Sequence, residues 1–408
     1  MKHFYEILLF TIFSVLMVSC SSGNEGTPPA EETDLPQGLT TIVPPTASFP
    51  EDDGAIKPSN DNLAKNLADF LTKAGPGIIK GLGTIQIKDE EYQEIKAFTD
   101  DLVKEEKSDK DKYNRIFGWI IANIQYEYGD NDPYPVFKNR KAICQGYANL
   151  LTVMLHSQGI SAMNVNGMLV QVGGHAWNYV YMDQWYVSDP TNKRDFAMSE
   201  LSKYGNSNGL NHLLPLSIDT DLFEDDNYVF NYQEGHLNLR KVKKCAKQLV
   251  VPFSTNGFRV TSFNPNEELP SNAEEIYLGY NIKTLGESMI GLNYHAPNVK
   301  YAYVDTKNAS MSSYGQVVYR ESTPYYIPAA TTTLQLKGVS TLGKNFLANH
   351  AKVENLVISS GTKTLESYAI ENCPNLRKVY VPEDAQVAED AFYGVHSSFQ
   401  IIRKNIKE

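Results

Sequence analysis

The chain has 408 residues, 42% hydrophobic content and a formal net charge of -11. Its length exceeds what a single core usually supports, so we expect two or three domains. The acidic balance argues against nucleic-acid binding, which requires a basic surface. The 4 cysteines are too few for a disulfide scaffold.

The first twenty residues, MKHFYEILLFTIFSVLMVSC, have the features of a secretory signal. Lys2 precedes an apolar run that ends at Val18 and is shorter than the ~20 residues that a membrane-spanning helix needs. The tripeptide that ends at Cys20 resembles a bacterial lipobox, in which the cysteine is lipidated and becomes the mature N-terminus. We expect a lipoprotein signal over residues 1–20, with an ordinary signal peptide or an anchor helix as the alternative.

Residues 21–55 are rich in Ser, Gly, Pro, Thr and acidic residues, which predicts a disordered tether. A lipid and a tether would hold a globular part in water beside a membrane. Ser21, directly after the lipidated cysteine, favours sorting to the outer membrane by resemblance to other lipoproteins. We therefore expect a lipid-anchored protein of the bacterial cell envelope, at the outer membrane and facing the periplasm or the surface.

Three amphipathic patterns follow the tether. The first, within residues 60–82, is interrupted at Gly75. The second covers residues 88–104, where apolar side chains recur at spacings of three and four. The third is a helix that Ser108 caps and that continues to about Ile124, where turn residues end it.

Cys144 opens the next predicted helix, which ends at Gly159. From Ser161 the apolar period changes from helical spacing to two, which predicts strands. His175 and Asp189 then fall on two successive strands of a meander. The three residues occur in the segments NRKAICQGYANLL and GGHAWNYVYMDQWYVSDPT.

A thiol, an imidazole and a carboxylate can act as a nucleophile, its base and the group that orients the base. The helix N-terminus, the nearby Arg140 and Lys141, and a protonated His175 would each favour a Cys144 thiolate. Asp189 would fix the tautomer of His175. Each residue alone has an ordinary structural explanation, but the three together favour acyl-transfer or amide-hydrolysis chemistry.

The sequence also suggests which residues surround the thiol. We expect Gly146 to keep the first helical turn open to an acyl group, and Tyr147 and Trp177 to wall the substrate cleft. The backbone N–H of Cys144 is one expected oxyanion donor.

Beyond about residue 274 the chain repeats itself with a period near 23: residues 341–363, 364–386 and 387–407 align, with a looser copy at 282–305. Residues 306–333 interrupt this array. The period lies in the range of leucine-rich repeats, whose units stack into a solenoid because none can bury its apolar side alone. Cys373 falls on a structural repeat position.

Residues 85–215 resemble the transglutaminase-like domain of the papain-like cysteine superfamily. VFKNRKAICQGYANLLTVMLHSQGI resembles its nucleophile helix, GGHAWNYVYMDQWYVSDPT its His–Asp hairpin, and RIFGWIIANIQYEY the preceding helix. The resemblance implies that Cys144, His175 and Asp189 are its triad. The papain-type oxyanion glutamine has no counterpart, because Lys138 stands at the comparable offset.

ENCPNL and NLRKVYVP resemble the BspA-like leucine-rich repeats of bacterial surface proteins. We therefore expect an α+β protein, with a papain-like transglutaminase core of helices and an antiparallel sheet, and a C-terminal leucine-rich-repeat solenoid. The expected domains are residues 56–270 for the transglutaminase-like part and 271–408 for the repeats.

Two functions remain open. The first is a secreted cysteine acyl hydrolase or acyltransferase, with a mild preference for a peptidase or amidase, whose repeats bind the target. The second is an inactive surface adhesion or binding protein that uses the same fold as a scaffold. The expected partners are a protein or peptide substrate, a surface protein or glycan on the repeats and the membrane through the lipid, with no nucleic acid. No motif indicates a metal or another cofactor.

Overall fold

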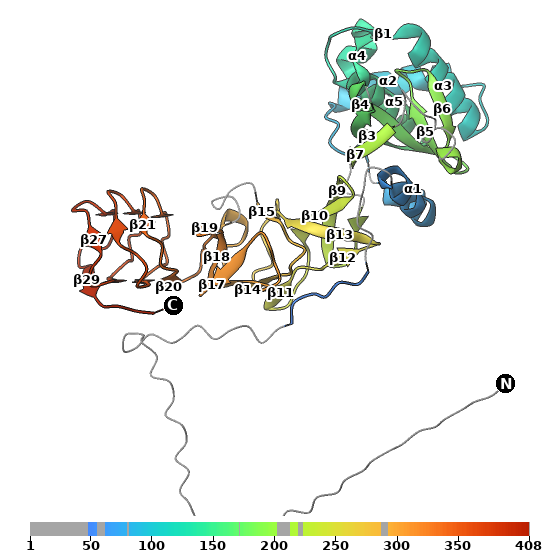
Figure 1. Cartoon of the computed structure of the whole chain (residues 1–408). Helices are drawn as coiled ribbons and strands as arrows, with labels where there is room; N and C mark the ends of the chain where they lie inside the picture. Colours follow the sequence, from blue (N-terminus) through green and yellow to red (C-terminus); the bar gives the residue numbers. More distant parts are fainter. Residues whose placement is uncertain are drawn as a thin grey trace, which may run out of the picture. The chain divides into compact units, whose positions relative to one another are not determined.

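The computed structural model describes residues 48–54, 62–79, 81–170, 172–201, 213–218, 223–286 and 293–407 (Figure 1). The predicted signal and Cys20 lie outside these ranges. The longer helices of the described part are α1 (Leu63–Ala74), α2 (Asp89–Leu102), α3 (Asp109–Asn123), α4 (Pro133–Asn139) and α5 (Cys144–Ser157). None of these helices has the length and apolar content that a bilayer crossing needs.

The helices predicted at 88–104 and after Ser108 are confirmed as α2 and α3. The hydroxyl of Ser108 accepts a hydrogen bond from the backbone N–H of Asp111, at 3.1 Å, and so caps α3. The short helix α4 was not predicted: its first residue is Pro133, a residue that suits the first turn of a helix as well as a loop. Because Pro133 lies among turn residues, the sequence analysis assigned this segment to a turn and not to a helix.

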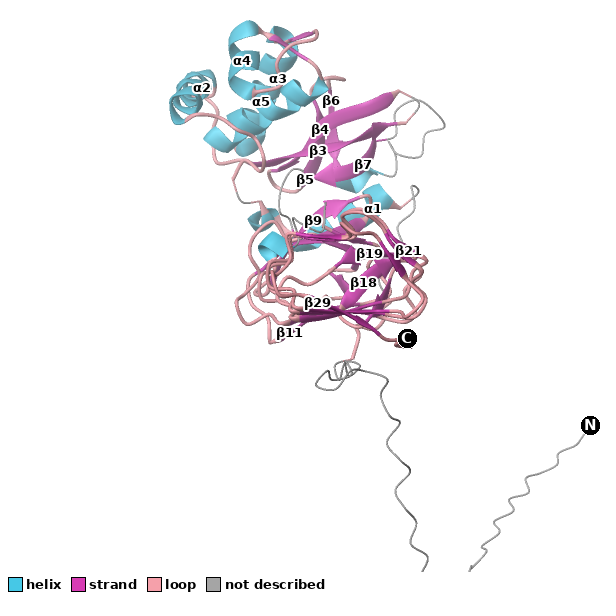
Figure 2. Ribbon diagram, turned by 90° about the vertical axis from the view of Figure 1, so that its left-hand side faces the viewer, coloured by secondary structure: helices cyan, strands magenta, loops and turns pink. Residues whose placement is uncertain are grey.

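The first part of the chain has a helical layer against an antiparallel sheet, with α2, α3, α4 and α5 on one side of the strands (Figure 2). The strands against this layer are β3 (Ser161–Leu169), β4 (Gly173–Tyr181), β5 (Trp185–Asp189), β6 (Arg194–Ala197) and β7 (Leu213–Ile218). Strands β9 (Tyr228–Gln233) and β10 (His236–Val242) extend the sheet beyond β7, and β8 (Phe223–Glu224) pairs with β9. Helix α5 is buried along most of its length, and its apolar side chains join those of α2, α3 and α4 in one core.

Strands β3, β4 and β5 form the predicted meander, and β3 also pairs with β7. His175 lies opposite Gly167 on β3. A Cβ atom at Gly167 would lie 2.0 Å from the backbone oxygen of Leu214, so only glycine allows β7 to approach here. This contact fixes the sheet beneath the start of β4.

Parallel pairing begins before the boundary that we expected at 270/271. Strand β13 (Phe258–Phe263) pairs in parallel with β10 and β15 (Thr284–Leu285), and β14 (Glu275–Leu278) pairs in parallel with β11 (Gln248–Val250) and β16 (Tyr301–Val304). A hairpin partner, β12 (Ser254–Thr255), pairs with β13. The expected boundary therefore falls inside a continuous set of paired strands.

The C-terminal repeats form a parallel β-solenoid, as the 23-residue period predicts. Its strands stack in three columns: β20 (Thr333–Leu336), β23 (Asn355–Ile358), β26 (Lys378–Val381) and β29 (Gln400–Arg403); β21 (Thr341–Leu342), β24 (Thr364–Leu365) and β27 (Gln386–Val387); and β22 (Leu347–Ala348), β25 (Ile370–Glu371) and β28 (Phe392–Tyr393). Leucine, isoleucine and valine side chains fill the space between the columns.

An antiparallel sheet interrupts the parallel columns. Its strands are β17 (Ser312–Tyr314), β18 (Val317–Arg320) and β19 (Thr323–Tyr326). They lie within residues 306–333, where the sequence predicts an interruption of the array, so this prediction is confirmed.

Part of the expected tether is packed rather than extended into solvent. Asp52 forms an ion pair with Arg259, at 2.9 Å, and the ring of Phe49 lies 5.9 Å from that of Tyr277. The carboxylate of Asp53 accepts a hydrogen bond from the hydroxyl of Ser254. Residues 48–54 therefore belong to the folded part, which corrects the expected tether end at residue 55.

Candidate active site

Helix α5 begins at Cys144, as predicted, and a short parallel pair of strands fixes the chain just before it. Strand β1 (Gln125–Tyr126) pairs with β2 (Lys141–Ala142), and the backbone N–H of Glu127 donates to the oxygen of Ala142 at 3.0 Å. The first N–H groups of a helix have no partners within it and favour negative charge. Cys144 is partly exposed, so its sulfur occupies a position that suits a reachable thiolate.

His175 and Asp189 lie on β4 and β5, and the structure brings them together. Nε2 of His175 lies 2.9 Å from Oδ2 of Asp189. The side chain of Asp189 is fully buried and that of His175 is 7% exposed. Because Nε2 contacts the carboxylate, Nδ1 is the ring nitrogen left for the thiol of Cys144.

Two further side chains hold the carboxylate, and the sequence analysis missed both. The amide of Asn192 donates to Oδ2 of Asp189 at 2.7 Å, and its Nδ2 lies 3.2 Å from Nε2 of His175. Arg194 forms an ion pair with the same carboxylate at 3.5 Å. Asn192 lies in the turn after Asp189 and Arg194 begins β6 directly after that turn, but no motif in the sequence marks either residue as a partner of the carboxylate.

The pKa directions agree with a thiolate and an imidazolium. Burial raises the pKa of Cys144, but a hydrogen bond with His175 and the backbone N–H groups of Ala176 and Gln145 outweigh it, and the net pKa is lowered. Burial lowers the pKa of His175, but its bonds to Asp189 and Cys144 raise it to about 9. Burial likewise opposes ionisation of Asp189, yet its contact with His175 keeps that pKa below its ordinary value.

The cations expected beside the thiol are directed elsewhere. The guanidinium of Arg140 lies 4.4 Å from the ring centroid of Trp119 and 4.7 Å from that of Phe137. Lys141 forms an ion pair with Glu127 at 2.9 Å. The lowered pKa of Cys144 therefore comes from the imidazole and backbone N–H groups, and not from these two side chains.

The three residues expected to form the cleft are buried. A Cβ atom at Gly146 would lie 2.7 Å from Cβ of Ala142, so Gly146 allows close packing and does not open a path to the thiol. Tyr147 is 5% exposed and its hydroxyl donates to the backbone oxygen of Ile124. Trp177 is fully buried, and its ring stacks at 6.0 Å from that of His175, which it supports from behind.

An exposed aromatic ring, that of Tyr126, lies near the thiol instead, and Tyr128 lies next to Tyr126. Tyr126 is 61% exposed and Tyr128 is 91% exposed. Tyr126 pairs with Ala142, its ring lies 6.4 Å from that of Tyr147, and burial together with the neighbouring Cys144 raises its pKa. These two rings are accessible to a substrate, whereas the three residues predicted to form the cleft are buried.

Metal ligands do not gather near the thiol or elsewhere in the described part of the chain. No group of three His, Cys, Asp or Glu side chains within it is arranged to hold a metal ion. The described cysteines Cys144, Cys245 and Cys373 are all free thiols. Burial raises the pKa of the other two, so Cys144 is the described thiol that favours ionisation.

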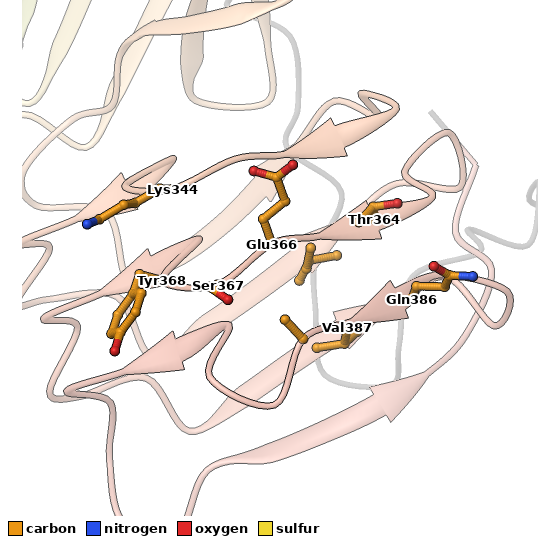
Figure 3. A pocket seen from close by; sticks show the side chains of 9 residues that line it. Lys344, Thr364, Glu366, Ser367, Tyr368, Gln386 and Val387 are labelled. Carbon is orange, nitrogen blue, oxygen red and sulfur yellow. The ribbon is translucent and has the colours of Figure 1, made fainter.

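The solenoid carries a separate pocket of about 670 Å³ (Figure 3). Lys344 and Tyr368 lie toward one end of it and Gln386 toward the other, with Glu366 between them (Figure 3). The ammonium of Lys344 lies 5.5 Å from the ring centroid of Tyr368, and the exposed ring of Tyr393 packs edge-on against that ring. Aromatic, amide and charged groups thus meet on one face of the repeats.

Comparisons with known proteins give partial matches. Curated relatives include kyphoscoliosis peptidase from Homo sapiens, 29% identical over 111 residues, and from Mus musculus, 27% identical over 117 residues. These alignments cover 22% and 24% of this chain, and 17% and 18% of the relatives. The chain therefore spans less than a fifth of the length of these relatives.

Solved structures with similar parts include a TGase, at 20% identity and a TM-score of 0.23, covering 26% of this chain and 34% of that one. A leucine-rich repeat protein from Eubacterium ventriosum has 19% identity and a TM-score of 0.22, covering 32% of this chain and 41% of that one. The profile of the transglutaminase-like superfamily matches residues 96–190, which include Cys144, His175 and Asp189. The chain therefore contains a transglutaminase-like core, followed by a parallel β-solenoid.

Proposed function

We propose that this protein is a cysteine acyl hydrolase or acyltransferase that acts through Cys144, His175 and Asp189. The observation that carries the proposal is the position of the imidazole of His175, which interacts with the thiol and also lies 2.9 Å from the buried carboxylate. Members of the transglutaminase-like family are usually cysteine peptidases or acyltransferases, which supports the same chemistry.

In the first step the Cys144 thiolate attacks the carbonyl carbon of an amide. A C–S bond forms, and the carbonyl electron pair moves to oxygen, where the backbone N–H of Cys144 is the expected donor. The C–N bond then breaks while the His175 imidazolium gives its proton to the leaving nitrogen. An amine departs and a thioester remains on Cys144. Asp189 holds the ring orientation throughout.

In the second step an acceptor attacks the thioester carbonyl, and neutral His175 takes the acceptor's proton. The C–S bond breaks and the thiolate–imidazolium pair returns. Water as acceptor releases an acid, whereas an amine as acceptor forms a new amide. We favour water, because it is abundant and because the curated relatives are named peptidases.

We also propose that the solenoid binds the target, as a surface protein or a glycan, through repeats of the BspA-like type. The pocket beside Tyr368 and the exposed ring of Tyr393 support a binding role for this face. A glycan array and a protein pull-down, each with wild type and Tyr393→Ala, test this role. Equal retention by the two proteins in both assays would contradict it.

The proposed location is the bacterial outer membrane, through a lipid on Cys20. This proposal rests on the N-terminal sequence alone. Incorporation of a clickable fatty acid into wild type but not into Cys20→Ala tests it. Incorporation into neither protein would leave the ordinary signal peptide or the anchor helix as the explanation, and equal incorporation into both would place the lipid on another residue.

The catalytic proposal is tested by the rate at which iodoacetamide alkylates Cys144 at pH 7, followed by the mass of the peptide that contains it. We expect wild type to react at least ten times faster than His175→Ala, and faster than Cys245 in the same chain. Rates equal to those of His175→Ala would instead support the alternative, a binding protein whose core is a scaffold.

The acceptor is tested with β-casein, with and without dansylcadaverine. New peptides that require Cys144 indicate hydrolysis, and dansylated casein indicates transfer. Cys144→Ala is the control for both products.

A further inference from the structure

Four buried polar side chains lie between helix α5 and the sheet, and we refer to them as the polar seam: Asn149, Thr152, Asn164 and Asn178. Their exposed fractions are 9%, 1%, 1% and 0%, so they are removed from solvent. The rest of this interface is formed by leucine, valine, methionine and alanine side chains. The seam is therefore a polar feature inside an apolar contact.

Hydrogen bonds connect the members of the seam. The amide of Asn178 lies 3.0 Å from the backbone oxygen of Ala148, 2.9 Å from Oγ1 of Thr152 and 2.8 Å from Oδ1 of Asn164. The hydroxyl of Thr152 donates to Oδ1 of Asn164 at 2.6 Å. The amide of Asn164 in turn donates to Oδ1 of Asn149.

Stability alone does not account for such a seam. A buried polar group costs free energy unless it is bonded, and apolar side chains of the same size would fill the space without that cost. What a bonded network adds is a single permitted arrangement, because any displacement leaves several groups unpaired at once. The seam therefore acts chiefly on the register of α5 against β3 and β4.

That register is what the candidate active site needs. Asn178 follows His175 on β4, and its partner Ala148 follows Cys144 by about one turn on α5. The amide of Gln145, next to the nucleophile, donates to Oδ1 of Asn149 at 2.8 Å and continues the seam to the first turn. A slip by one strand residue, roughly 3.3 Å, would separate the sulfur from the imidazole.

A second polar contact fixes the third residue of the site. The hydroxyls of Tyr113 on α3 and Ser188 on β5 lie 2.7 Å apart, and both residues are fully buried. Ser188 directly precedes Asp189, and it lies opposite Asn178 in the sheet. Each segment that carries a member of the site is thus held by a polar bond within one to three residues of that member.

We propose that the polar seam is a positioning device that sets Cys144 against His175 and so maintains the thiolate–imidazolium pair. The inference rests on the proposed function. Asn149, Thr152, Asn164 and Asn178 are positioning residues, because they act through the backbone of α5, β3 and β4 and not on a substrate.

The test uses the full chain and a matched pair of variants at one position. Thr152→Val keeps the volume and removes the hydroxyl, whereas Thr152→Ser keeps the hydroxyl and loses a methyl group. Alkylation of Cys144 by iodoacetamide is measured from pH 5 to pH 10, together with thermal unfolding. We expect wild type and Thr152→Ser to react as a thiolate at pH 6–7, and Thr152→Val to react at least five times more slowly there, with equal rates at pH 10.

A triple variant, Thr152→Val, Asn164→Leu and Asn178→Leu, extends the test to an apolar seam. We expect it to lose the reactivity at pH 6–7 by more than tenfold. Asn281→Leu is the control, since Asn281 is also a buried asparagine whose amide donates to backbone oxygens, here those of Phe253 and Val260. It should retain the wild-type pH profile whatever its unfolding temperature.

The outcomes separate the two proposals. If wild type reacts fast at pH 6–7 and the Thr152→Val profile matches it, the seam has no positioning role and the proposed function stands. If wild type itself reacts as an ordinary thiol, the proposed function fails and the seam inference fails with it. Should the triple variant not fold, the comparison of Thr152→Val with Thr152→Ser decides.

Discussion

Nε2 of His175 lies 2.9 Å from Oδ2 of Asp189, and Asp189 is completely buried. Burial by itself would lower the pKa of His175. The contact with Asp189 outweighs this effect and, together with the bond to Cys144, raises the pKa to about 9. The imidazolium therefore persists through neutral pH, where an ordinary histidine is mostly neutral.

The first prediction concerns pH. Amide-cleaving activity should rise as the thiolate forms below the ordinary thiol pKa and fall again as His175, the proton donor to the leaving nitrogen, loses its proton near pH 9. Asp189→Asn removes the charge that favours the imidazolium, so the alkaline limb should move down by about one to three pH units. Rates measured from pH 5 to pH 10 give both limbs.

A nearby carboxylate supplies the control for this prediction. Asp195 lies on β6 and forms an ion pair with Lys110 at 3.4 Å. Asp195→Asn should leave the alkaline limb in place. An alkaline limb that stays near pH 9 in Asp189→Asn would show that this carboxylate does not set the protonation of His175.

The second prediction concerns the packing of the nucleophile helix. A Cβ atom at Gly146 would lie 2.7 Å from Cβ of Ala142 and 2.9 Å from Cγ2 of Val136, so Gly146→Ala must push α5 away from its neighbours. We expect a loss of about 1–3 kcal/mol in the free energy of unfolding, together with slower alkylation of Cys144. Denaturant titration and the alkylation rate measure the two effects.

Gly118→Ala is the matched control, since it also lies inside a helix, α3, with no atom within 4 Å of the added Cβ. It should be neutral or stabilising by about 0.5–1 kcal/mol. Equal destabilisation by both substitutions would mean that the close approach at Gly146 is unimportant.

Most of the helices and strands that position the site could be predicted from the sequence, because they depend on local patterns of apolar residues. The helix start at Cys144 and the strands of His175 and Asp189 follow from apolar periods, and the structure confirms them. To predict whether Tyr147 and Trp177 line the cleft, one must know on which side of its helix or strand each side chain lies. That depends on packing between elements distant in the sequence, and both residues are buried.

The polar contacts could not be inferred for the same reason. Nothing near Asn192 in the sequence shows that its amide reaches the carboxylate of Asp189. Asparagines in strands and helices, such as Asn164 and Asn149, are ordinarily surface residues, and only the assembled interface shows them buried and bonded. The solenoid was easier to predict, since the same pattern of apolar residues recurs in each repeat.

The third prediction concerns a corner of the solenoid where successive turns have left-handed backbone. Asn349, Asn372 and Gly394 have φ values of 61°, 53° and 64°. Asparagine and glycine tolerate this region, whereas alanine has a steric cost. Asn372→Ala should lower the free energy of unfolding by about 1 kcal/mol and Asn372→Gly should change it little. Denaturant titration of both variants distinguishes a conformational effect, which glycine escapes, from the loss of the side chain, which both share.

The last prediction concerns a buried histidine in the solenoid. His350 is 5% exposed, and burial lowers its pKa to about 4. Below about pH 6.5 the unfolded chain binds a proton at this residue while the folded chain does not, so stability falls as the pH drops toward 4. This single group should remove about 2–3 kcal/mol of unfolding free energy between pH 7.5 and 4.5.

The repeat itself provides a substitution that removes this titration. Strand β22 pairs with β25, with Leu347 opposite Ile370, so Cys373 occupies in the next turn the position that His350 occupies here. His350→Cys should therefore fit the core. Between pH 7.5 and 4.5 this variant should lose about 2–3 kcal/mol less unfolding free energy than wild type. His295→Gln, at a partly exposed histidine, should follow wild type. Denaturant titrations at pH 7.5 and 4.5 measure the difference. If wild type and His350→Cys lost equal free energy of unfolding, His350 would take up a proton in the folded protein as readily as in the unfolded chain.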